Sequence, residues 1–262
     1  MSTPILNRAL PHDPFPRPRL PGVAPLDPAA WLAVTDSHAA QMAERARLIA
    51  DHRETVIWQA PGTGAMLDEL VDVVLAALPA GYSVAGDTAT RPDGVCVPLD
   101  RADPLGTLGR LVQEDLCLLH KPEGSAEHVL KAAVLCFPAG WRLADKADRP
   151  LTAIHVPVAS YDDGVAARVQ RLFDGVRPGR PLWRSNMLWY DDPALHQPNK
   201  HGHARPADKA TRSGAYLRTE RQAILRLPRT GAVVFSIHTC VMARDAALAL
   251  RDAGAAEIVN EG

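Results

Sequence analysis

The chain has 262 residues, 29 basic and 30 acidic side chains, a formal net charge of −1 and 47% hydrophobic residues. This balance lacks the basic field that nonspecific nucleic-acid binding requires, and a charged fraction of 23% argues against wholesale disorder. No segment approaches 18 uncharged apolar residues, and no charged start precedes a long apolar run. We therefore expect a cytoplasmic protein that does not span a membrane.

The first part of the chain predicts an extended arm followed by helices. Prolines are frequent in residues 1–26, which we expect to form this arm ahead of a single domain over 27–262. Asp27 can cap a helix that has Pro28 at its first position. Helical patterns then cover 31–50 and 66–78, so a helical extension precedes the rest of the domain.

Strand signals dominate the later part of the chain. Short β-type runs lie at 133–137, 151–158 and 232–240, a weaker one lies at 182–190, and helices are expected at 164–173 and 243–253. Because the elements lack regular βαβ spacing, we expect an α+β fold with a mostly antiparallel sheet.

Common catalytic signatures are absent. The sequence has no CxxC pair, no Walker A motif, no GxGxxG, no HExxH and no GxSxG, and a lone Gly62-Thr63-Gly64 without a clear strand before it is a weak phosphate signal. The cysteines have apolar neighbours and are expected to be buried free thiols: Cys96, Cys117, Cys136 and Cys240. A polar loop with His196, His201 and His203 lacks a further metal ligand, so a solvated loop explains it better than a metal site.

Two histidines lie within β-type runs. His238 interrupts an apolar run, where alternation can place it on a solvent face. His155 lies between Ile154 and Val156, shortly before Pro157. It can be a satisfied core or edge histidine, or an iron ligand on a rigid apolar strand.

Three polar segments interrupt apolar surroundings. Residues 111–116 include Gln113, Glu114 and Asp115, which an amphipathic helix with an exposed face also explains. Residues 141–146 end with Lys146 and can be an ordinary surface segment. The segment 217–229 carries four arginines, which can bind the two propionates of a heme or form an exposed, salt-bridged helix.

These segments follow one another in an order that resembles the catalytic subunit of heme-dependent oxidative N-demethylases. The resemblance covers roughly residues 20–242 and rests on the segments 103–105, 111–116, 136–141, 145–146, 154–158, 184–186 and 217–237. It implies a PAS-like domain, an antiparallel sheet flanked by helices, that holds heme b. It also implies a monooxygenase-type reaction that converts a small secondary amine such as dimethylamine, with O2, to a primary amine and formaldehyde. Electrons would come from a partner reductase that carries the flavin and the iron–sulfur cluster.

The resemblance, together with local chemistry, suggests roles for particular residues. His155 is the expected iron ligand. Arginines are expected to anchor the propionates or orient oxygen, two glutamates to hold the substrate ammonium, and two further polar residues to complete the distal wall. These residues are, in that order, Arg218, Arg221 and Arg226; Glu220 and Glu114; and Lys146 and Gln113.

The sequence departs from the family pattern at three places. Ala159 and Met187 stand where proline and tryptophan are expected, and His238-Thr239-Cys240 replaces a stretch that ends in tyrosine. Two other functions therefore remain open, a non-enzymatic heme-PAS sensor and a scaffold that has lost its cofactor.

Overall fold

The computed structural model describes residues 3–15, 22–155, 163–198 and 214–260. The strands are β1 (Ala24–Pro25), β2 (Ile57–Gln59), β3 (Ser83–Ala85), β4 (Thr88–Thr90), β5 (Cys96–Pro98), β6 (Asp115–His120), β7 (Val129–Val134), β8 (Leu182–Tyr190), β9 (Tyr216–Arg226) and β10 (Val233–Ala243). The helices are α1 (His38–Asp51), α2 (Arg53–Val56), α3 (Gly64–Ala76), α4 (Pro104–Leu111), α5 (Leu151–His155), α6 (Asp163–Gly175) and α7 (Arg244–Asn260), with 3-10 turns η1 (Pro28–Ala30) and η2 (Leu143–Asp145).

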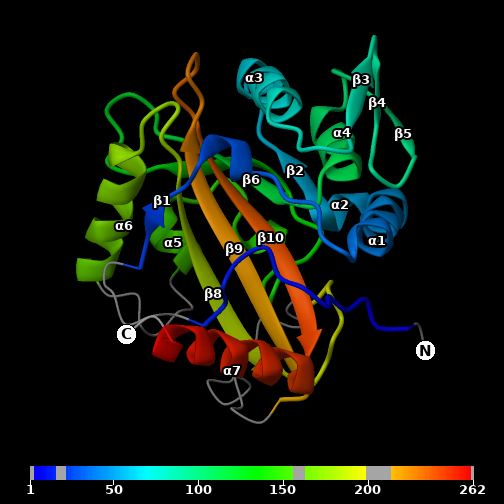
Figure 1. Cartoon of the computed structure of the whole chain (residues 1–262). Helices are drawn as coiled ribbons and strands as arrows, with labels where there is room; N and C mark the ends of the chain where they lie inside the picture. The colour runs from blue at the N-terminus through cyan, green and yellow to red at the C-terminus, as the bar shows by residue number, and fades with distance from the viewer. Residues whose placement is uncertain (1–2, 16–21, 156–162, 199–213, 261–262) are drawn as a thin grey trace.

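The fold is α+β, as the pattern of elements predicts. A seven-stranded antiparallel sheet has the strand order β1-β8-β9-β10-β6-β7-β2, with the long strands β8, β9 and β10 at its centre (Figure 1). A second sheet, β3-β4-β5, lies beside α1, α3 and α4, on the side of the molecule away from α6 (Figure 1). None of the helices in the described ranges is both long and apolar enough to cross a membrane.

Many of the expected elements are confirmed where a local pattern specifies them. The predicted helices at 66–78, 164–173 and 243–253 correspond to α3, α6 and α7, and the predicted strands at 182–190 and 232–240 correspond to β8 and β10. Asp27 caps η1 by accepting a hydrogen bond from the Ala29 backbone N–H at 3.0 Å. The helix expected at 31–50 begins only at His38, and the run at 133–137 overlaps just the end of β7.

The strand expected at 151–158 is wrong over its described part, because Leu151–His155 forms α5. Glu127, which precedes β7, accepts hydrogen bonds at 2.9 Å from both the backbone N–H and the hydroxyl of Thr152. This carboxylate satisfies donors at the start of α5 as a helix cap does, although it lies 25 residues away in the chain. Residues 156–158 lie outside the described part of the chain.

The exposed-helix explanations for two polar segments are also wrong. Gln113, Glu114 and Asp115 are buried where the chain leaves α4 and enters β6. The segment 217–226 is the buried central strand β9 rather than an exposed helix. His238, which alternation could place in solvent, is only 1% exposed.

Three other expectations need correction. The N-terminal part is not entirely helical, because the three-residue strands β3, β4 and β5 form the small sheet. Cys96 is exposed, whereas the other three cysteines are buried and all four are free. A short strand, β2, does precede Gly62-Thr63-Gly64, although it is an edge strand of the antiparallel sheet.

Candidate functional site

The pairing of β9 with β10 sorts the candidate residues onto two opposite faces of the sheet. Neighbouring residues in a strand point to opposite faces, and residues paired across an antiparallel ladder share a face. One face, here called the α6 face, is covered by α5 and α6, which pack on Ile224 and Ile237. The other, here called the arm face, is covered by the described N-terminal residues 3–15, η1 and α1.

A carboxylate cluster lies on the α6 face and consists of Arg218, Glu220, Gln222 and Thr239. Glu220 is 9% exposed, and its Oε2 accepts a hydrogen bond from Gln222 Nε2 at 2.9 Å. Arg218 Nε lies 3.7 Å from Glu220 Oε1, and Thr239 pairs directly with Glu220 across the two strands. Arg218 Nε and Thr239 Oγ1 are buried and have no hydrogen-bond partner among the described residues. Two unsatisfied polar atoms therefore flank a buried carboxylate.

The surroundings of the carboxylate cluster are largely apolar. Side chains from the sheet, from α5 and from α6 form one hydrophobic cluster on this face, which includes Leu151, Phe173, Ile224, Val233 and Ile237. Partly buried apolar side chains extend it: Trp141, Ile154, Val169, Leu172 and Phe235. Such a surface lowers the local dielectric, which strengthens any charge interaction made by Glu220.

Lys146 lies against the last turn of α5, the helix that ends at His155. Lys146 is buried, and its Nζ donates a hydrogen bond to the Ile154 carbonyl in the last turn of α5. Burial lowers the pKa of Lys146, because water no longer stabilises its charged form as well. The backbone of His155 completes α5, and its side chain lies outside the described part of the structure.

The Arg226 guanidinium is hydrogen-bonded to backbone carbonyls, two of them at the end of α6. It donates to the carbonyls of Phe173, Val176 and Gly231 at 2.7, 2.8 and 2.6 Å. A cation at a helix C-terminus satisfies carbonyls that lack intrahelical partners and interacts favourably with the helix dipole. These contacts give Arg226 a structural function.

A buried ion pair lies on the arm face. His238 Nδ1 and Glu114 Oε1 are 2.9 Å apart, and each residue is 1% exposed. Burial alone would lower the pKa of His238, but the adjacent Glu114 carboxylate outweighs this effect and raises the pKa to about 9. Burial likewise opposes ionisation of Glu114, yet the charge and hydrogen bond of His238 hold its pKa below the usual value. The pair is therefore ionised at neutral pH.

The N-terminal arm closes over this ion pair. His12 Nε2 lies 3.0 Å from Thr219 Oγ1, and Arg221 donates to the Trp31 carbonyl at 2.5 Å. Burial lowers the pKa of His12 to about 4, and the charges of Arg221 and His238 add to this effect. His12 is thus neutral at pH 7, beside two buried cations.

A comparison with protein families gives the decisive assignment. A family model described as "Haem-dependent oxidative N-demethylase, alpha subunit-like" matches residues 22–246 of the chain. The chain belongs to this family. The match covers both faces of the central sheet, both helices of the α6 face and the segments that carry the resemblance. An alpha-subunit-like chain implies a partner subunit, and the family is an oxidative, heme-dependent one.

The structure separates the residues that the resemblance to the N-demethylase family groups together. Arg218 and Glu220 are neighbours on the α6 face, whereas Glu114 and Arg221 share the arm face. Gln113 lies with neither group, since it bonds Thr35 and Gln41 near α1. The polar residues around Glu114 and Glu220 are therefore two distinct sites.

Four residues of these sites are not among the site residues predicted from the sequence. Gln222 and Thr239 belong to the carboxylate cluster, and His12 and His238 belong to the arm-face site. Gln222 and Thr239 could have been found by applying strand alternation to 217–226 and 233–243. No sequence signal links His12 to a strand 207 residues away.

The histidine loop offers no metal site within the described structure. His196 Nδ1 lies 2.8 Å from the Cys136 carbonyl oxygen, while His201 and His203 fall outside the described residues. No group of three or more His, Cys, Asp or Glu side chains that could hold a metal ion occurs in the ranges that the structure describes.

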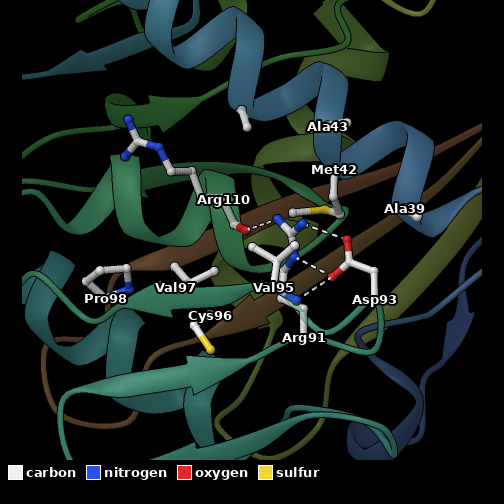
Figure 2. A pocket seen from close by; sticks show the side chains of 11 residues that line it. Ala39, Met42, Ala43, Arg91, Asp93, Val95, Cys96, Val97, Pro98 and Arg110 are labelled. Atoms are coloured by element: carbon white, nitrogen blue, oxygen red, sulfur yellow. Dashed lines mark hydrogen bonds and ion pairs between the residues drawn. The ribbon is translucent and has the colours of Figure 1, made fainter.

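A hollow of about 320 Å³ borders α1 and β5 (Figure 2). It is lined mainly by apolar side chains of α1 and β5, together with Arg91, Asp93 and Arg110. Arg91 is already paired with Asp93 at 2.6 Å and bonds the Arg110 carbonyl at 2.7 Å, as Figure 2 shows. With its charges satisfied internally, this hollow offers little for catalysis.

Proposed function

We propose that the protein is a heme-dependent oxidative N-demethylase that removes a methyl group from a small secondary amine. The oxidant is O2, and electrons come from a partner reductase that carries flavin and an iron–sulfur cluster. The observation that carries this proposal is that the Glu220 carboxylate is buried on an apolar surface. A buried carboxylate on an apolar surface binds an alkylammonium ion strongly, because water competes poorly there. Membership of the N-demethylase family supports it.

We further propose a PAS-like core formed by β6 to β10 with α5 and α6. Numbered along the chain, these five strands lie in the order 3-4-5-1-2 across the sheet. Read from the other edge, this is 2-1-5-4-3, the arrangement of a PAS domain. In that arrangement the cofactor belongs between the sheet and the helices that connect the second and third strands, which is the α6 face.

The residues of the α6 face are compatible with heme b. The apolar cluster next to α5 suits a porphyrin, and we propose His155, directly after Ile154, as the iron ligand. When bound, heme b supplies the oxidation of the N-methyl carbon by O2. Of the three arginines considered for its propionates, Arg221 lies on the arm face and Arg226 is held by three carbonyls. Among the described residues, Arg218 is the one of these three arginines with a buried N–H that lacks a partner on the α6 face, so it remains open to an anionic group.

Glu220 and Lys146 have separate functions in this proposal. Glu220 binds the substrate ammonium, and Gln222 orients the carboxylate by donating to its Oε2. Lys146 positions His155 by holding the last turn of α5 through the Ile154 carbonyl. The Glu114–His238 pair acts from the other face of the sheet, where it fixes β10 against the chain that enters β6.

The absorption spectrum of the purified, heme-loaded protein tests the cofactor assignment. We expect a Soret band that shifts or disappears in His155→Ala and is unchanged in the control His52→Ala, since His52 is exposed beside α2. A protein that binds no heme, or a Soret band unaffected by His155→Ala, would contradict this part of the proposal.

Formaldehyde release tests the reaction. With a chemical or enzymatic reductant, O2 and short secondary methylamines, we expect release that falls roughly 10- to 100-fold in kcat/KM for Glu220→Gln, because a charge-assisted hydrogen bond to the ammonium is lost. The control Glu54→Gln changes an exposed residue of α2 and should leave the rate unchanged. Oxygen binding without amine-dependent oxygen consumption would instead indicate a sensor.

A further inference from the structure

The two opposite charges in the carboxylate cluster indicate which class of substrate the site can bind. Arg218 and Glu220 are 3% and 9% exposed, and Arg218 Nε lies 3.7 Å from Glu220 Oε1. A buried carboxylate meant for a simple ammonium ion would be expected to stand without a resident cation. Here Arg218, two residues before Glu220 in the same strand, already neutralises the Glu220 carboxylate.

One N–H group of Arg218 makes no hydrogen bond within the described structure. Its Nη1 donates to the Leu195 carbonyl at 3.0 Å and its Nη2 to the Phe137 carbonyl at 2.7 Å, so each terminal nitrogen is hydrogen-bonded to the backbone. Its Nε–H is buried and makes no hydrogen bond within the described structure. A buried donor on a cation costs free energy unless a ligand or water satisfies it, and an anionic oxygen satisfies it best.

The Glu220 carboxylate has one oxygen that accepts a hydrogen bond and one that does not within the described structure. Gln222 donates to Oε2, whereas the contact given for Oε1 within the described residues is the 3.7 Å ion pair with Arg218 Nε, which is too long for a hydrogen bond. Thr239, 1% exposed and directly across the ladder, adds an unpartnered hydroxyl that can accept or donate. The cluster therefore presents one acceptor for a cation, one donor for an anion, and a hydroxyl beside them.

We propose that the site takes a small zwitterionic N-methylamine, of the N-methyl amino acid class, in preference to a simple dialkylammonium ion. The substrate ammonium binds Glu220, and the substrate carboxylate binds Arg218 Nε–H. One carbon separates the two charges in an N-methyl α-amino acid, so both groups can reach protein charges that are 3.7 Å apart. A lone ammonium, in contrast, is attracted by Glu220 and repelled by Arg218 at nearly the same distance.

The chemical step is that of the proposed function, on which this inference rests. R–NH–CH3, O2, two protons and two electrons give R–NH2, formaldehyde and water. A C–H bond of the methyl group is oxidised and the N–C bond breaks, O2 is reduced, and the two electrons come from the partner reductase. The carboxylate of the substrate takes no part in the bond changes and serves only recognition.

Isothermal titration calorimetry on the purified holoprotein tests the inference without depending on turnover. The ligands are N-methylglycine, N-methylglycinamide, which lacks the carboxylate, and dimethylammonium. We expect N-methylglycine to bind about 10- to 100-fold more tightly than the amide, the range of a charge-assisted hydrogen bond. Equal affinity for the acid and the amide, or tighter binding of dimethylammonium, would overturn the proposal.

Substitution of Arg218 gives a crossover that a structural role would not produce. In Arg218→Gln, we expect kcat/KM for N-methylglycine to fall by about 10- to 100-fold, while that for dimethylamine rises because Glu220 is no longer neutralised. The control Arg47→Gln removes an exposed arginine of α1 and should alter neither. If Arg218→Gln does not fold, the acid-to-amide ratio of the unmodified protein decides alone.

Two further outcomes separate the possible failures. A propionate could provide the anion that Arg218 binds, in which case Arg218→Gln loses heme and the acid-to-amide ratio of the holoprotein is close to one, which overturns the proposal. Tight, carboxylate-dependent binding without formaldehyde from any amine would reject the proposed function and keep the ligand class. Formaldehyde release from dimethylamine, without any preference for the zwitterion, would keep the proposed function and reject the ligand class.

Discussion

The buried His238–Glu114 pair predicts how the stability of this protein depends on pH. His238 is protonated in the folded state up to a pKa of about 9, compared with its ordinary value of 6.5. The pair therefore stabilises the fold fully below pH 6.5, and this contribution is lost as pH rises from 6.5 through 9. We expect His238→Asn, which removes the cation, to abolish this loss.

The magnitude follows from the size of the pKa change. A rise from 6.5 to about 9, at about 1.4 kcal/mol for each pH unit, corresponds to about 3 kcal/mol of stability. Both partners are 1% exposed, so solvent screening does not reduce this value much. Removing one partner from a buried ion pair typically costs ~3–5 kcal/mol, which agrees in scale.

Urea unfolding followed by circular dichroism at a series of pH values between 6 and 9 measures the effect. The free energy of unfolding of the unmodified protein should fall by about 3 kcal/mol across this interval. His238→Asn should be about 3 kcal/mol less stable at pH 6 and should approach the unmodified protein near pH 9. Cys117 and Cys136, whose pKa values burial raises to about 12, are present in both proteins and cancel in the difference.

A difference in stability between the two proteins that stays constant from pH 6 to pH 9 would contradict this prediction. It would mean that the folded state does not hold the proton on His238. Glu114→Gln provides a second check, because it removes the carboxylate whose charge is the largest cause of the raised pKa of His238. The loss of stability across the same pH interval should then become much smaller.

Three further substitutions test the packing around the sites. Gly109→Ala should lower the stability by about 1–3 kcal/mol in thermal melts, because a Cβ would lie 2.6 Å from Ile49 Cδ1. Asp115→Asn should cost ~3–5 kcal/mol in urea unfolding, because it leaves the fully buried Arg45, now 2.6 Å from the carboxylate, without its counter-charge. Glu69→Gln should cost about 1–3 kcal/mol and speed hydrogen exchange at Thr230, whose N–H donates to Oε2 at 2.8 Å; unchanged exchange would argue against this role.

Predicting which polar residues of segment 217–226 lie together requires its secondary structure to be known. Arg218 and Arg221 are three positions apart, a spacing that keeps side chains on the same side of a helix but on opposite faces of a strand. Because 217–226 forms β9, Arg218 joins Glu220, and Arg221 joins Glu114 behind the sheet. The residues were therefore identifiable as polar positions in an apolar strand, whereas their grouping was not.

Features that depend on neighbouring residues along the chain could be predicted from the amino-acid sequence. Apolar periodicity specified α3 and α6, β-type runs specified β8 and β10, and Asp27-Pro28 specified the capped turn η1. The order of several motifs was enough to indicate the family, which the family model confirms over residues 22–246. Each of these signals is local or additive along the sequence, so no contact between distant segments was needed.

Features that depend on contacts between distant segments could be assigned only from the fold. The apolar run that contains His155 became the helix α5 because Glu127 caps it, and the N-terminal arm covers its own sheet through His12. Strand pairing also placed Thr239 directly across from Glu220 in the buried, charge-balanced cluster. Such contacts join residues whose positions in the sequence carry no record of their distance in space, and they override local propensity when burial and hydrogen bonding favour another structure.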